Sequence, residues 1–78
     1  MAIDEKKLNA REMFYLMGFV YSVSPDGDII YSHRRCETEF LFYLEEKTFE
    51  CIDIDNRAIS IQEHLAVHKQ MKELGWIE

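Results

Sequence analysis

The amino-acid sequence predicts an α+β domain in which an antiparallel meander of three to four strands lies between an N-terminal and a C-terminal helix. Apolar residues recur at helical spacing near both ends of the chain and alternate at strand spacing in the middle. Every aromatic residue except Trp76 lies between Phe14 and Phe49, so the strands carry most of the bulky core. Because 78 residues suit one domain, we expect residues 1–78 to fold as a single unit.

A helix is expected near the N-terminus, and two residues are candidates for its start. Asp4 is a suitable N-cap, with apolar residues on either side at the spacing of a hydrophobic staple. Asn9 is the other candidate, because Glu12 can cap it reciprocally. Gly18 is suited to end the helix in the left-handed conformation. Residues 14–17 are also compatible with a strand.

Strands are expected in the centre of the chain over residues 19–23, 28–33, 38–44 and 49–54. Residues 24–27, Ser-Pro-Asp-Gly, are typical of a tight hairpin turn, since Pro favours the second turn position and Gly the left-handed position that follows. Residues 45–47 form the next turn. On the last strand, Phe49 and Cys51 share one face, opposite to Ile52.

A second helix is expected after Ser60, which forms an S-x-x-E capping box with Glu63. Its predicted core-facing stripe consists of Ile61, Leu65, Val67, His68, Met71 and Leu74. Gly75 stands where a C-cap belongs, and Trp76 can then fold back onto the core.

Residues 40–44 are apolar at every position, which differs from the alternation of a strand with one solvated face. One face of the sheet is therefore expected to be covered by a second subunit or a partner, although a pair of helices could cover it as well. On this basis we expect a homodimer.

The net charge of −6 belongs entirely to residues 37–55, where seven acids face Lys47 alone. These acids are Glu37, Glu39, Glu45, Glu46, Glu50, Asp53 and Asp55. They are interpreted either as a surface that binds a basic protein partner or as a solvated strand pair whose charges prevent edge-to-edge aggregation. Direct binding to nucleic acid is not expected, because phosphate contacts need clustered Lys and Arg.

His64 and His68 are four residues apart, a spacing that zinc sites use on helices. Together with Cys51 they match the second half of a zinc-finger pattern. The first half is missing, because Cys36 lies too far from Cys51. We therefore expect no metal and no other cofactor, and keep a small metal-binding domain built on Cys51, His64 and His68 as an alternative.

An enzymatic activity is not expected. Two arginines precede Cys36, which favours a reactive thiol, but a nucleophile also needs a positioned base. His33 is close only in sequence. Two cysteines are too few for a disulfide scaffold, so we expect free thiols, with one Cys36–Cys51 bridge as the alternative. No apolar run approaches the roughly 20 residues of a membrane span and no signal-peptide pattern is present, so we expect a cytoplasmic protein.

The closing run Ser60-Ile61-Gln62-Glu63-His64-Leu65, which ends Lys72-Glu73-Leu74-Gly75-Trp76, resembles the C-terminal helix of small uncharacterised proteins of Gram-positive phages and prophages. The short, acidic helix–sheet–helix format is similar as well. The resemblance implies an accessory or host-modulating role and transfers no site. The expected function is a non-enzymatic interaction protein that binds a protein partner through the acidic hairpin or an exposed sheet face. A structural protein of a homo-oligomer is the alternative.

Overall fold

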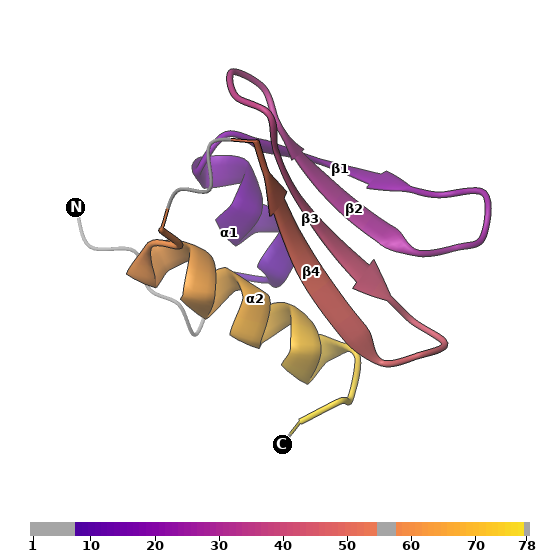
Figure 1. Ribbon diagram of the computed structural model, residues 1–78. Helices are drawn as coiled ribbons and strands as arrows, with labels where there is room; N and C mark the ends of the chain where they lie inside the picture. The colour runs from indigo at the N-terminus through magenta and orange to yellow at the C-terminus, as the bar shows by residue number, and fades with distance from the viewer. Residues whose placement is uncertain (1–7, 55–57, 78) are drawn as a thin grey trace.

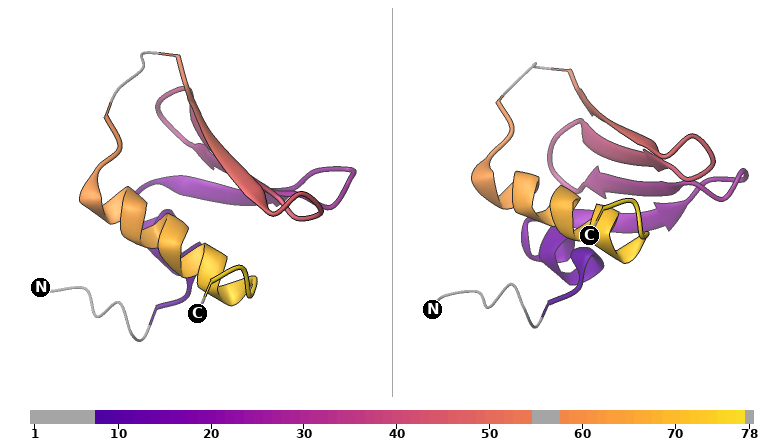
Figure 2. Two further views of the ribbon diagram at one scale, coloured as in Figure 1. Left: turned by 60° about the horizontal axis from the view of Figure 1, so that its bottom comes forward. Right: turned by 90° about the horizontal axis from the view of Figure 1, so that it is seen from below.

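The computed structural model describes residues 8–54 and 58–77 and shows the predicted α+β fold (Figure 1). The elements are α1 (Ala10–Leu16), β1 (Phe19–Val23), β2 (Ile29–His33), β3 (Thr38–Tyr43), β4 (Thr48–Asp53) and α2 (Ile61–Glu73). The strands form one antiparallel sheet in the order β1-β2-β3-β4, so β1 and β4 are its edges. Both helices lie on the same side of the sheet and pack against each other (Figure 2).

Helix α1 begins at the second of the two candidate caps. The Asn9 side chain accepts a hydrogen bond from Glu12 N at 2.8 Å, and Asn9 N donates to Glu12 Oε1 at 3.0 Å. The alternative cap, Asp4, lies outside the described residues. Residues 14–16 belong to the helix, so the strand interpretation of this stretch was wrong. Gly18 follows the C-cap with a φ of +96°, a conformation that favours glycine.

Helix α2 has the predicted capping box, and four residues of its predicted stripe lie in the core or pack against it, namely Leu65, Val67, Met71 and Leu74. Glu63 N donates to Ser60 Oγ at 3.1 Å, and Ser60 N to Glu63 Oε1 at 2.9 Å. Ile61 is 75% exposed, and His68 is exposed too. The helix packs against α1, and its fully buried Ala66 lies on the side of α2 opposite to these two positions.

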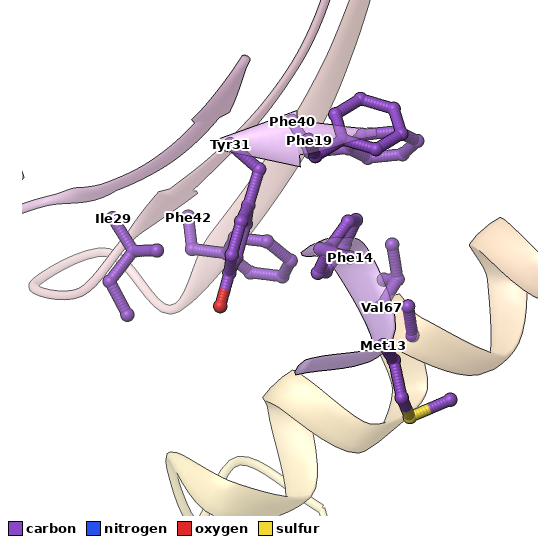
Figure 3. Packing of buried hydrophobic residues seen from close by; sticks show 9 residues of the cluster. Met13, Phe14, Phe19, Ile29, Tyr31, Phe40, Phe42 and Val67 are labelled. Atoms are coloured by element: carbon purple, nitrogen blue, oxygen red, sulfur yellow. The ribbon is translucent and has the colours of Figure 1, made fainter. Parts of the chain in front are cut away.

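The core is aromatic, as predicted, and is organised around Phe14 of α1 (Figure 3). The Phe14 ring stacks on Tyr31 with centroids 4.0 Å apart, and it meets Phe19 edge-on at 5.5 Å. Phe40 and Phe42 of β3 complete the cluster and are fully buried. Because these rings come from three strands and one helix, the cluster joins the two layers.

Buried polar contacts tie the helices to the sheet and to each other. The Tyr31 hydroxyl donates to Gln70 Oε1 of α2 at 2.6 Å. Burial, followed by the nearby charge of Glu73, raises the pKa of Tyr31. Ala10 N, at the start of α1, donates to Glu73 Oε2 at 2.7 Å. The C-terminus also folds back as predicted, with Trp76 packed on the core.

The turns follow the sequence prediction closely. Gly27 N donates to Ser24 O at 2.9 Å, and Asp28 N to Ser24 Oγ at 3.1 Å, which closes the β1–β2 hairpin. The β3–β4 turn contains Lys47 with a φ of 58°. The expected strands agree with the observed ones to within a residue at each end.

Candidate binding surfaces

The helices cover only one face of the sheet, and the side chains of the other face form a mixed apolar and polar surface. We call this surface the outer face. Its residues are Val20, Ser22, Ile30, Ser32, Glu39, Leu41, Tyr43, Thr48, Glu50 and Ile52, as the strand register and the alternation of side chains determine. Val20 is 47% exposed and Ile52 46% exposed. The apolar positions of residues 40–44 therefore divide between the core and this face, on which the structure places no helix.

The acidic residues of the predicted hairpin are divided among three places. Glu39 and Glu50 lie on the outer face. Glu45 and Glu46 lie in the β3–β4 turn at one end of the sheet, whereas Glu37 lies in the β2–β3 loop at the other end. Asp53 ends β4 near that loop, on the side of the core, where its Oδ2 accepts from Thr38 Oγ1 at 2.8 Å. Asp55 lies outside the described residues.

Two of the outer-face carboxylates are held by hydroxyl groups of the same face. Ser32 Oγ donates to Glu39 Oε2 at 3.0 Å, and the Tyr43 hydroxyl donates to Glu50. The hydrogen bond to Glu50 raises the pKa of Tyr43, and the carboxylate of Asp28 acts in the same direction. Each of these carboxylates thus accepts a hydrogen bond from a neighbouring side chain of the outer face.

A hollow of about 510 Å³ opens on the outer face beside the β2–β3 loop. Glu37 and Glu39 contribute carboxylates to its lining, and Ile52 and Ile54 contribute apolar surface. Ser32, His33, Cys36 and Thr38 complete the lining. A long basic side chain matches this combination, because its aliphatic stem packs on apolar surface while its charged end meets a carboxylate.

A second open groove, of about 480 Å³, runs between α1 and the edge strand β1. Its apolar floor includes Tyr15, Leu16 and Val20, and Arg11 and Arg34 also line it. The sequence reasoning missed this groove. Its signal was present in Tyr15 and Leu16, two apolar residues of α1 outside the helix face that contributes Met13 and Phe14 to the core.

The metal alternative does not receive support from the arrangement of its three residues. Cys51 lies on the core side of β4 and packs against the cluster, whereas His64 and His68 are exposed on α2. Within residues 8–54 and 58–77, no group of three or more His, Cys, Asp or Glu is placed to hold a metal ion. The interpretation of His68 as a residue packed near the sheet was also wrong.

His33 has a structural role at the start of β1. Its Nδ1 accepts from Arg35 N at 3.1 Å, which leaves Nε2 to donate to Met17 O at 3.0 Å. Both ring nitrogens are thus engaged with the backbone and not with Cys36, whose Sγ lies 3.3 Å from Thr38 Oγ1. Cys36 and Cys51 are not joined by a disulfide bond.

No family model, curated protein or solved structure matches this chain. Among the helices that the structure describes, none is long and apolar enough to cross a bilayer.

Proposed function

We propose that this protein is a non-enzymatic interaction protein that binds a basic protein partner through the outer face of its sheet. The observation that carries the proposal is the hollow beside the β2–β3 loop, in which Glu37 and Glu39 lie next to exposed isoleucines. Ile52 is 46% and Ile54 68% exposed, so the hollow offers apolar surface as well as charge. A partner that presents Lys or Arg from an apolar surface fits both parts.

A cytoplasmic accessory role agrees with this proposal. Cys36 and Cys51 are not joined by a disulfide bond, as is usual in a reducing compartment. An accessory role is also what the resemblance of the closing helix to small phage and prophage proteins implies. An accessory protein can act by occupying a partner, for which an uncovered sheet face of mixed character is sufficient.

Assembly of the chain with itself is the alternative occupant of the same face. Val20 and Ile52 would provide apolar contact area in a homodimer. In a two-fold dimer through this face, however, the carboxylates of Glu39 and Glu50 from both copies enter the same interface, and like charges in an interface weaken it. For this reason we favour a basic partner over a second copy.

Two double variants with the same charge change test where the partner binds. Glu37→Gln with Glu39→Gln alters the hollow, and Glu45→Gln with Glu46→Gln alters the opposite end of the same hairpin. A partner captured from an extract of the producing cells is identified, purified and titrated against both variants. The proposal expects at least a tenfold loss of affinity for the first variant and less than threefold for the second.

Equal losses in the two variants would show that only net charge matters and would overturn the assignment to the hollow. Sedimentation of the purified protein alone distinguishes the alternative occupant. A stable dimer that Ile52→Asp dissociates would replace the basic partner by a second copy.

A further inference from the structure

The edge strand β1 exposes its backbone to a possible fifth strand. Arg34 N donates to Gly18 O at 3.0 Å, and Ser24 N to Asp28 O at 2.9 Å, at the two ends of the β1–β2 pairing. In an antiparallel pair the hydrogen-bonded residues alternate, so Gly18, Ser24 and the even-numbered residues between them face β2. The N–H and C=O groups of residues 19, 21 and 23 therefore point away from the sheet.

Nothing in the side chains of β1 protects this edge. Its sequence is Phe-Val-Tyr-Ser-Val, without the charged residue or proline that proteins place on edges to prevent strand addition. Strand β4, at the other edge, carries the exposed Glu50 and ends in Asp53. By this criterion, β1 is the edge that is more available to pair with another strand, and β4 is the less available one.

The groove of about 480 Å³ lies directly beside the β1 edge, so a strand added there would rest on α1. Tyr15 and Leu16 are each 59% exposed on the helix side of the groove. An extended peptide points every second side chain toward one face, and the side chains on that face would pack on Tyr15 and Leu16. The groove can therefore select side chains, while the β1 backbone supplies hydrogen bonds.

Two guanidinium groups give the groove a positive character in an acidic protein. The Arg11 guanidinium lies over the Tyr21 ring, 4.2 Å from its centroid, and that of Arg34 lies over the Tyr15 ring at 4.7 Å. Stacking on a ring fixes the plane of a guanidinium and leaves its edge N–H groups available to an anion. Among the described residues that line the groove, the one acid, Glu12, already accepts from Asn9 N.

From this arrangement we propose that the groove between α1 and β1 binds an extended acidic peptide segment of another protein as a fifth strand of the sheet. The segment carries a carboxylate side chain on each side of an apolar one. The apolar side chain lies on Leu16, and the carboxylates meet Arg11 and Arg34. This site is separate from the hollow beside the β2–β3 loop and does not depend on the proposed function.

The spacing of the carboxylates follows from strand geometry. The Arg11 guanidinium lies over Tyr21, and the backbone N–H of Arg34 donates to Gly18 O. Gly18 and Tyr21, which mark the two arginine positions along the β1 edge, are three residues apart. Three residues of a strand span about 10 Å. Side chains that face the helix recur about every 7 Å along a peptide, so carboxylates at positions 1 and 5 of the segment lie about 14 Å apart and flank the two arginines, with an apolar position 3 between them.

The test is a titration of the ¹⁵N-labelled full chain with a synthetic peptide whose centre reads Asp-Thr-Val-Thr-Asp, followed by NMR. The expected result is saturable binding with a dissociation constant below about 1 mM. The largest shifts are expected at the amides of Phe19, Tyr21 and Val23, which also become protected from hydrogen exchange. Shifts confined to another surface, or no binding at 1 mM, would overturn the proposal.

Matched variants separate the groove from general charge attraction. Arg34→Gln is expected to weaken binding about tenfold, whereas Arg35→Gln, the same change at the neighbouring exposed residue outside the groove, leaves it within twofold. Leu16→Ser tests the apolar floor at a position that is already exposed, so the fold is retained. Equal effects of the two arginine variants contradict the assigned site.

A control peptide has N-methyl groups on the residues whose backbone N–H groups point toward β1. It keeps its charges but cannot donate the hydrogen bonds that join two strands. Loss of binding by this peptide supports strand addition, and binding equal to the parent excludes it. Protection of the β1 amides in the absence of any peptide, together with a dimer in sedimentation, would assign the edge to a second copy of the chain and overturn the proposal.

Discussion

The two edges of the sheet are built in opposite ways. Strand β1 is apolar, stands over the aromatic core and borders a groove that contains two arginines. Strand β4 is mostly exposed and carries Glu50, next to the acidic turn 45–46. Edge strands are sites of unwanted pairing unless charge or cover prevents it, so β4 has the features of a protected edge and β1 those of an edge available for binding. Two of the acids that make the protein acidic, Glu50 and Asp53, thus also distinguish the β4 edge from the β1 edge.

The largest expected effect is on stability, and it compares the packing of the core beneath the two edge strands. Phe14→Ala removes the buried ring that joins α1 to β1 and β2, and we expect a loss of about 3–5 kcal/mol in the free energy of unfolding. Phe49→Ala on β4, where the ring is 41% exposed, is expected to lose about 1 kcal/mol. Urea denaturation measures both. Similar losses would contradict the view that the β1 side is the anchored one.

The start of β1 provides the next test. A Cβ on Gly18 would lie 2.8 Å from Nε2 of His33, the atom that bonds Met17 O, and its φ is +96°. We expect Gly18→Ala to destabilise the protein by about 2–4 kcal/mol. Gly27→Ala is the control, since its φ is +89° but its Cβ would meet nothing within 4 Å. The expected loss there is about 1–2 kcal/mol, and equal thermal unfolding of the two variants would exclude the His33 contact as a cause.

A smaller effect on stability, which depends on pH, is expected from Tyr31 in the core between the two edge strands. Tyr31 in the unfolded chain ionises near pH 10, whereas burial raises its pKa in the folded protein. The folded state therefore keeps its full stability below about pH 10 and loses some of it as the pH rises further, because only the unfolded state releases the proton. Tyr31→Phe is expected to be about 1–2 kcal/mol less stable at pH 7, since Gln70 loses its buried partner.

Urea denaturation of this variant between pH 8 and pH 11 completes the measurement. The decline of stability above pH 10 is expected to be shallower in Tyr31→Phe than in the wild type. A decline of the same steepness in both proteins would contradict the role of Tyr31.

The smallest effect on stability concerns the protected edge. Glu50→Val removes a charge from the exposed strand β4, and we expect a change of less than about 0.5 kcal/mol in stability but increased self-association by sedimentation. Glu39→Val is the matched control, because it makes the same substitution on the outer face of an interior strand. Equal association of the two variants would show that face hydrophobicity, and not edge protection, controls assembly.

Elements that depend on local chemistry were predicted well from the sequence. The capping box of Ser60 and Glu63, the alternative cap at Asn9 and the turn at residues 24–27 all rest on hydrogen bonds between near neighbours. Such bonds are available to the chain before distant segments meet.

The candidate surfaces were predicted less well, because they depend on segments far apart in the sequence. The acidic residues 37–55 form one block in the sequence, but the hairpin places Glu37 and Glu45 at opposite ends of the sheet. The groove unites Arg11 of α1 with Arg34 of the β2–β3 loop, and the two are separated by the whole β1–β2 hairpin. The buried side of α2 was similarly set by its contact with α1.

The sequence by itself determined the order of helices and strands, the aromatic core and the sign and location of the net charge, because periodicity, capping and composition act within short stretches. The tertiary structure decided which face of the sheet remains uncovered, which edge is protected, and which charges lie together. The physical reason is that strand register and helix packing are set by burial of the core that distant segments share. The pattern within a short stretch of sequence does not specify these contacts.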